Sequence, residues 1–176
     1  MYKDKKTKEK LELSDRLNLG MSVLGLNQGL IQFADTKANG LVLFDSILLA
    51  VMVPHLGAIR YGGPIPTRVV LGAFFVTCGL ALLASLRVIV ARAPDTGEKR
   101  PTSIVFFKHI AALGRAHDYT ELFKESEGEQ VLESLLLSGY DIATIAQAKF
   151  RAYQTAERLT LLSAILWVVG LVLQVI

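Results

Sequence analysis

The sequence predicts an all-α integral membrane protein with three transmembrane helices, the first and last of which extend into a cytoplasmic helical bundle. Of the 176 residues, 52% are hydrophobic and only 20% are charged, and the mean hydropathy of +0.42 is high for a water-soluble domain. Long uncharged stretches recur, and no alternation of period two is long enough to form a sheet. A soluble enzyme and a disordered chain are therefore both disfavoured.

Three apolar stretches are long enough to cross about 30 Å of hydrocarbon as helices. The second and third contain no Asp, Glu, Lys or Arg, whereas the first contains one acid, Asp45. The link between the first two is short and rich in Gly and Pro, which predicts a tight turn between antiparallel helices. The stretches are 38–59, 69–86 and 159–176, and we expect a transmembrane hairpin at 38–92 with helices at 40–59 and 68–90, then a third transmembrane helix at 159–176.

The basic residues predict the orientation, because cytoplasmic loops carry the excess of Lys and Arg. Of the 19 Lys and Arg residues, all but Arg60 and Arg68 lie before residue 38 or between 87 and 158. We therefore expect a cytoplasmic N-terminal helix at 1–37, an external hairpin turn, a cytoplasmic helical region at 93–158 and an external C-terminus. The polar start of the chain is unlike a cleavable signal peptide.

Apolar residues at three- and four-residue steps predict one continuous helix from about Leu11 to about Pro54. After a polar linker at 93–101, the cytoplasmic region is expected to form several shorter helices. We expect these from Thr102 or Ser103 to Gly114, around 119–124, at 130–137 with Gly139 as the stop, and from Asp141 into the last transmembrane helix.

Polar residues on the first helix have two interpretations. Gln28, Gln32, Asp35 and Asn39 share one face, which is either solvated or lines a polar cavity. Asp45 lies at membrane depth, where an unpaired acid costs at least a few kcal/mol. We expect it to pair with Arg87 at the cytoplasmic end of the neighbouring helix, although Arg87 could instead extend to lipid headgroups.

Catalytic and metal-binding motifs are hard to assemble from this sequence. The three His residues are scattered, and His109 and His117 have no acid at metal-ligand spacing between them. There is no Gly-rich phosphate loop and no Gly-x-Ser-x-Gly elbow, and the single Cys78 excludes a disulfide framework. We expect no enzymatic activity, no metal and no cofactor.

Several segments together resemble a known family. Residues 32–38, which read Gln-Phe-Ala-Asp-Thr-Lys-Ala, run into the first transmembrane helix, and 106–110 read Phe-Phe-Lys-His-Ile. Tyr119 follows, and 145–153 with Lys149 lead into the last transmembrane helix. This pattern resembles the Pycsar transmembrane effectors, small bacterial antiphage proteins, from about Leu17 to the last helix.

The resemblance implies a function that composition does not. A partner nucleotide cyclase would sense infection and make a cyclic pyrimidine mononucleotide, cCMP or cUMP. The effector would respond by impairing the bacterial inner membrane, so that the infected cell stops growing or dies before phage matures. We also expect contacts with membrane lipids, a homo-oligomer, and no nucleic-acid partner.

A cyclic mononucleotide needs cations for its phosphate, an aromatic or apolar surface for its base, and amide or acid groups for its edges. We expect Lys37 and Lys149 to form the phosphate pair in a cleft between helices, although basic residues could equally attract lipid headgroups. The candidate ligand-binding residues are Gln28, Asp35, Lys37, Phe107, Tyr119, Lys149 and Tyr153.

The expected mechanism is that a ligand bound between the first and last cytoplasmic helices changes how protomers pack, and that continuous helices carry the change into the membrane. Two alternatives remain. One is a ligand-independent membrane scaffold or small channel. The other is a membrane-embedded hydrolase that uses Asp45 or the polar face around Asp35.

Overall fold

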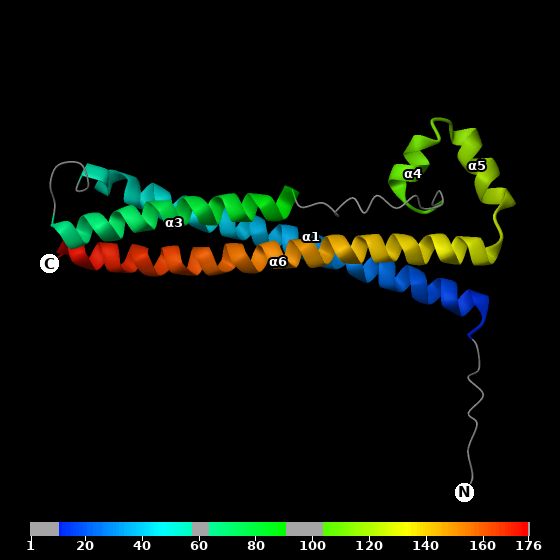
Figure 1. Cartoon of the computed structure of the whole chain (residues 1–176), viewed down its shortest axis with the longest axis horizontal. Helices are drawn as coiled ribbons and strands as arrows, with labels where there is room; N and C mark the ends of the chain where they lie inside the picture. The colour runs from blue at the N-terminus through cyan, green and yellow to red at the C-terminus, as the bar shows by residue number, and fades with distance from the viewer. Residues whose placement is uncertain (1–10, 58–63, 91–103, 176) are drawn as a thin grey trace, which may run out of the picture. The chain divides into compact units, whose positions relative to one another are not determined.

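The computed structural model describes residues 11–57, 64–90 and 104–175. Every regular element in these ranges is a helix, which confirms the all-α prediction. Three helices are long and apolar enough to cross a membrane. The elements are α1 (Leu13–Met52), the short 3₁₀ helix η1 (Val53–His55), α3 (Ile65–Val90), α4 (Phe107–Ala112), α5 (Ala116–Glu125) and α6 (Gly128–Val175) (Figure 1).

Helix α1 is continuous over 40 residues, as its periodicity predicts. Asp15 lies in the first turn, where a negative charge interacts favourably with the free amide groups of a helix start. The helix changes to the tighter η1 just before Pro54, because proline has no amide hydrogen to continue the α-helical pattern. The predicted turn between the first two apolar helices, at 60–68, lies outside the described residues as far as residue 63, and it is shorter than predicted because α3 already begins at Ile65.

Helix α6 differs from the prediction. The expected stop at Gly139 and restart at Asp141 are wrong, because α6 is a single helix of 48 residues. A glycine in a helix interior costs only about 1 kcal/mol relative to alanine. Since hydrogen bonding continues on both sides of Gly139 and the helix packs along its length, that cost does not break it.

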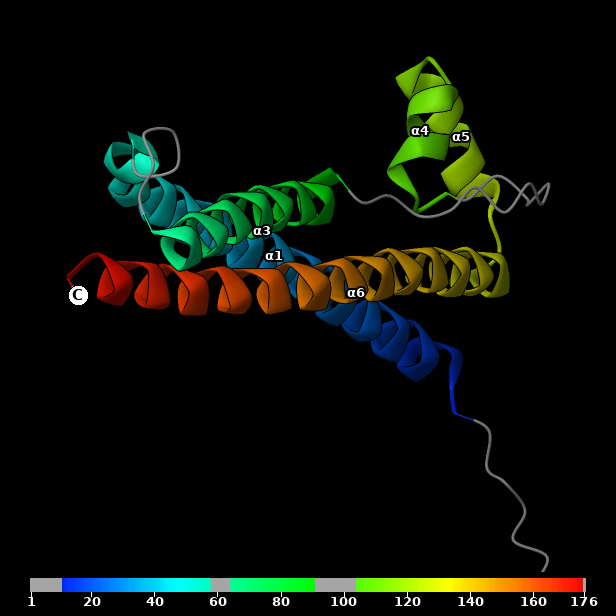
Figure 2. The same ribbon diagram turned by 60° about the vertical axis from the view of Figure 1, so that its left-hand side comes forward.

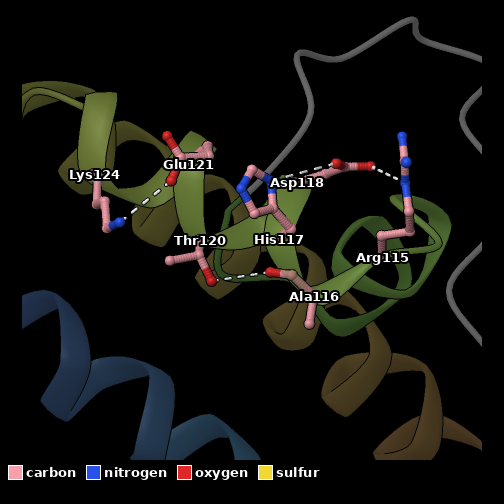
Figure 3. Close-up of polar contacts among 7 residues, drawn as sticks. All are labelled: Arg115, Ala116, His117, Asp118, Thr120, Glu121 and Lys124. Atoms are coloured by element: carbon pink, nitrogen blue, oxygen red, sulfur yellow. Dashed lines mark hydrogen bonds and ion pairs between the residues drawn. The ribbon is translucent and has the colours of Figure 1, made fainter.

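Helices α4 and α5 are short. The expected helix from Thr102 to Gly114 is present only as α4, and its predicted cap lies outside the described residues. Gly114 has a φ of 74°, a left-handed conformation that favours glycine, and it separates the two helices. Local contacts support α5 (Figure 3), where Arg115 pairs with Asp118 at 3.2 Å and Lys124 with Glu121 at 3.2 Å.

The chain divides into two compact units. Unit 1 comprises residues 1–28 and 95–143, and unit 2 comprises 29–94 and 144–176. Unit 1 therefore holds the start of α1, α4, α5 and the start of α6. Unit 2 holds the apolar parts of α1, α3 and α6. The cytoplasmic location of unit 1 stays a prediction.

In unit 1, α1 approaches α6 closely. Arg16 Nη1 lies 2.7 Å from Glu129 Oε1. A Cβ atom added to Gly20 would lie 2.7 Å from Leu135 Cδ2, so a larger residue would require the Leu135 side chain to shift. A groove of about 370 Å³ follows the same helix pair. The two helices thus meet directly through side chains within this unit.

In unit 2, α1, α3 and α6 lie side by side (Figures 1 and 2). Helix α1 runs parallel to α6, since Asp35 contacts Lys149 and the later Asp45 contacts Thr160. Helix α3 runs antiparallel to both. The core cluster comprises Leu48, Met52, Leu71, Phe74 and Cys78, with Trp167 and other α6 side chains packed against it.

Candidate functional site

Lys149 joins the three helices of unit 2. Its Nζ lies 2.6 Å from Asp35 Oδ1 on α1, and it donates to the backbone oxygens of Val88 at 2.8 Å and Ile89 at 3.1 Å. These two carbonyls belong to the last turn of α3, where helical donors are missing. An ammonium has three donors, and all three are engaged here. The Lys149 side chain is only 6% exposed.

The two lysines of the expected phosphate pair, Lys37 and Lys149, differ in burial and in contacts. The charge of Lys149 is already balanced by Asp35. These two candidate residues therefore form an ion pair with each other. Lys37 is exposed, and its Nζ lies 5.4 Å from the ring centroid of Phe33. Of the two lysines, Lys37 is therefore the one with an ammonium accessible to a ligand.

An aromatic pair lies beside this lysine. Phe33 on α1 and Phe150 on α6 stack with ring centroids 6.5 Å apart, and Phe33 is 51% exposed. Tyr153 follows Phe150 by three residues, which places it on the same side of α6. We call Phe33, Lys37, Phe150 and Tyr153 the aromatic surface.

Tyr153 is half-buried, and its hydroxyl donates to Glu157 Oε1 at 3.2 Å. Burial raises the pKa of Tyr153, and the negative charge of Glu157 raises it further. The hydroxyl is therefore a proton donor throughout the physiological range.

The candidate residues predicted from the sequence include Tyr153 but not Phe33 and Phe150, whose rings the structure brings together. Phe33 and Phe150 both lie in the segments that carry the family resemblance, but a phenylalanine on an apolar helix usually belongs to a core. The sequence does contain one indication of this surface. Phe33 and Lys37 are four residues apart on a helix, a spacing that places the cation over the ring.

Asp45 lies deeper in unit 2 and is fully buried. Thr160 Oγ1 donates to Asp45 Oδ2 at 2.8 Å, and the Ser163 hydroxyl is shared between Asp45 Oδ1 at 3.3 Å and the Thr160 backbone oxygen at 2.8 Å. The thiol of Cys78 lies 3.5 Å from the Asp45 backbone oxygen. The acid thus has hydroxyl partners from α6, which offset part of the cost of burying it.

The structure gives Asp45 these partners in place of the expected Arg87. Cys78 is the α3 residue beside Asp45. Arg87 lies nine residues further along α3, about 13 Å along the helix axis. The hairpin does place the helices side by side, but its register puts this arginine at another level.

The remaining candidates belong to unit 1. Gln28 is exposed on α1. On α5, the ring centroids of Tyr119 and Phe123 lie 6.2 Å apart. Phe107 begins α4, but its side chain lies outside the described residues. Among the residues that the structure describes, no three His, Cys, Asp or Glu side chains gather in a metal-binding cluster.

A comparison with known protein families identifies the family to which the chain belongs. A model described as the Pycsar effector protein domain matches residues 21–174. The chain belongs to the Pycsar effector family. The matched range contains all of α3 and most of α1 and α6. No curated protein and no solved structure matches the chain.

Membership confirms the resemblance of the sequence to the Pycsar effectors. The protein is an antiphage effector with three helices suited to a membrane, and its family links it to a nucleotide cyclase and a cyclic nucleotide. In this Pycsar effector, Lys149 and the aromatic surface both lie inside the matched range, on the helices that also supply the apolar segments.

Proposed function

We propose that this Pycsar effector responds to cCMP or cUMP made by a partner cyclase and then impairs the bacterial inner membrane, which stops growth of the infected cell. The observation that carries the proposal is the family match over 21–174, which spans the three apolar helices and the aromatic surface. The nucleotide signal and the membrane response would then belong to one domain.

The aromatic surface supplies the chemistry that a cyclic pyrimidine nucleotide requires. Lys37 would pair with the phosphate, exchanging its contact with the Phe33 ring for a charged hydrogen bond. The exposed ring of Phe33 and the partly buried ring of Phe150 would stack on the base, an interaction worth about 1–3 kcal/mol per base. The Tyr153 hydroxyl would hydrogen-bond to a polar edge.

A ligand on this surface would contact α1 and α6 together, because Phe33 and Phe150 come from these two helices. It would stabilise one packing of the protomers in a homo-oligomer over another. To change the ratio of the two packings from 1:99 to 99:1, the ligand must bind the favoured packing about 10⁴-fold more tightly than the other. The same helices continue into the apolar segments, so the change would reach the lipid.

Liposomes that contain the purified protein test this function. We expect an enclosed dye to leak on addition of cCMP or cUMP and to stay inside with cAMP or without nucleotide. In the Lys37→Gln variant, half-maximal leakage should need about ten-fold more nucleotide, because a charged phosphate contact is lost. Lys124→Gln, which also removes an exposed lysine, is the matched control and should behave as wild type.

Vesicles that stay tight with every cyclic nucleotide would overturn the proposed response. Leakage that is equal with and without nucleotide, and the same in the Lys37→Gln and wild-type proteins, would instead identify a ligand-independent channel or scaffold.

A further inference from the structure

Unit 2 contains a groove of about 920 Å³ between α3 and α6. Arg87 and Arg151 line it, one from each helix, together with apolar side chains that include Leu80, Leu83 and Leu159. The groove is separate from the aromatic surface, whose residues are not among those that line it. Its cations are therefore not among the residues of the nucleotide site proposed above.

The two arginines lie at the same level of the groove. Lys149 on α6 contacts the Val88 carbonyl on α3, and Gly170 lies against Leu71, so residue numbers rise along α6 as they fall along α3. Arg87 precedes Val88 by one residue, and Arg151 follows Lys149 by two. Within the described ranges, no hydrogen bond or ion pair engages either guanidinium.

The opposite end of the groove is apolar. Leu80 lies seven residues from Arg87, and Leu159 lies eight residues from Arg151, which corresponds to about 11–12 Å along the helix axes. Both leucines lie toward the predicted membrane interior, at the level of the uncharged runs of α3 and α6. The groove thus runs from a pair of cations to a hydrocarbon-like surface.

We propose that this groove binds an anionic phospholipid, with its phosphate between Arg87 and Arg151 and one acyl chain along Leu80, Leu83 and Leu159. The planar guanidinium forks match phosphate oxygens, and two of them from facing helices can share one group. The leucines match an acyl chain, whereas a nucleotide base against them would leave its polar edges without partners.

A lipid in this position would contact α3 and α6 at once. Its phosphate would lie at the cytoplasmic surface of the membrane in the predicted orientation, where anionic lipids concentrate. The groove would then select the lipid that surrounds the effector.

Native mass spectrometry of the full chain in detergent, with phosphatidylglycerol as the probe, tests the site. The double variant Arg87→Gln with Arg151→Gln should bind this lipid roughly ten- to thirty-fold more weakly than wild type. The matched control is Arg68→Gln with Arg158→Gln, which removes two exposed arginines outside the groove and should retain wild-type affinity. A far-ultraviolet circular dichroism spectrum establishes that each variant is folded, and Arg151→Gln alone serves if the double variant is not.

Two further measurements, on a Leu83 variant and on displacement by nucleotide, identify the occupant. Leu83→Gln should weaken phosphatidylglycerol binding and leave the weak binding of glycerol 3-phosphate unchanged. Equal losses in the groove variant and in the control would show diffuse charge attraction and overturn the proposal. Displacement of the lipid by cCMP or cUMP would also overturn it, because the groove would then be a nucleotide site. Since the measurement needs no nucleotide response, a failure of the leakage test leaves it intact.

Discussion

A single buried ammonium holds three helix segments in contact. Lys149 bonds to the Asp35 carboxylate and to two carbonyls at the end of α3. Replacing it by methionine keeps the apolar stem but leaves all three oxygens without their donor. Hydrogen bonds to charged groups contribute about 1.5–3 kcal/mol, and Asp35 is 34% exposed and can turn to water.

We therefore expect Lys149→Met to lower the free energy of unfolding by about 2–3 kcal/mol, measured by denaturation in detergent micelles with circular dichroism. Lys37→Met removes an exposed lysine and should change the free energy by no more than about 0.5 kcal/mol. Equal losses in the two variants would contradict the role assigned to Lys149.

The sequence could predict that Lys149 matters but not what it contacts. A lysine on a helix that enters a membrane is conspicuous, and Asp35 also stands out at the start of an apolar stretch. The carbonyls of Val88 and Ile89 carry no signal in the sequence, because every residue has one. They become partners only because α3 ends beside Lys149, a long-range consequence of helix register.

At the scale of the elements, hydrogen bonds from α6 to Asp45 fix the register of α1 against α6. Thr160→Val with Ser163→Ala would leave the buried carboxyl without these donors. We expect a loss of about 1–3 kcal/mol in the free energy of unfolding. Adding Asp45→Leu should recover most of it, because replacing all the partners by apolar groups removes the unsatisfied acid.

The matched control is Thr36→Val with Ser46→Ala on α1. These exposed hydroxyls bond only to carbonyls of their own helix, so the control should change stability by less than about 0.5 kcal/mol. A triple variant no more stable than the double one would show that Asp45 contributes little through these bonds.

The elements themselves could largely be predicted from the sequence. An uncharged run of 18 residues is a strong signal and predicts the apolar parts of α3 and α6, whereas the apolar part of α1 is predicted from a run that contains one acid, Asp45. Gly139 misled the prediction for α6 because glycine is ambiguous, since it ends some helices and is tolerated within others. Only the packing of the whole helix decides between these outcomes.

At the scale of the whole molecule, the distribution of Lys and Arg predicts which ends of the helices face the cytoplasm. Single-cysteine variants in a Cys78→Ser background test this in intact cells that lack the cyclase. An impermeant maleimide should label Ile65→Cys, at the start of α3 that is predicted to be external, and should label Glu125→Cys on α5 only after permeabilisation. The reverse pattern would show that the orientation is inverted.

The polar contacts within unit 2 are distributed unevenly among its three helices, and this bears on how each helix is restrained against sliding along its neighbours. Helices α1 and α6 are joined at two depths, through Asp35 with Lys149 and through Asp45 with Thr160. The polar contacts of α3 are the two carbonyls of its last turn and the weak contact of the Cys78 thiol, beside the apolar packing of Leu71 and Phe74 in the core. A shear of α3 past its neighbours breaks the two hydrogen bonds to Lys149, whereas a shear of α1 against α6 breaks the Asp35–Lys149 ion pair and the hydroxyl contacts of Asp45. Polar contacts therefore restrain the sliding of α3 less than that of the parallel pair.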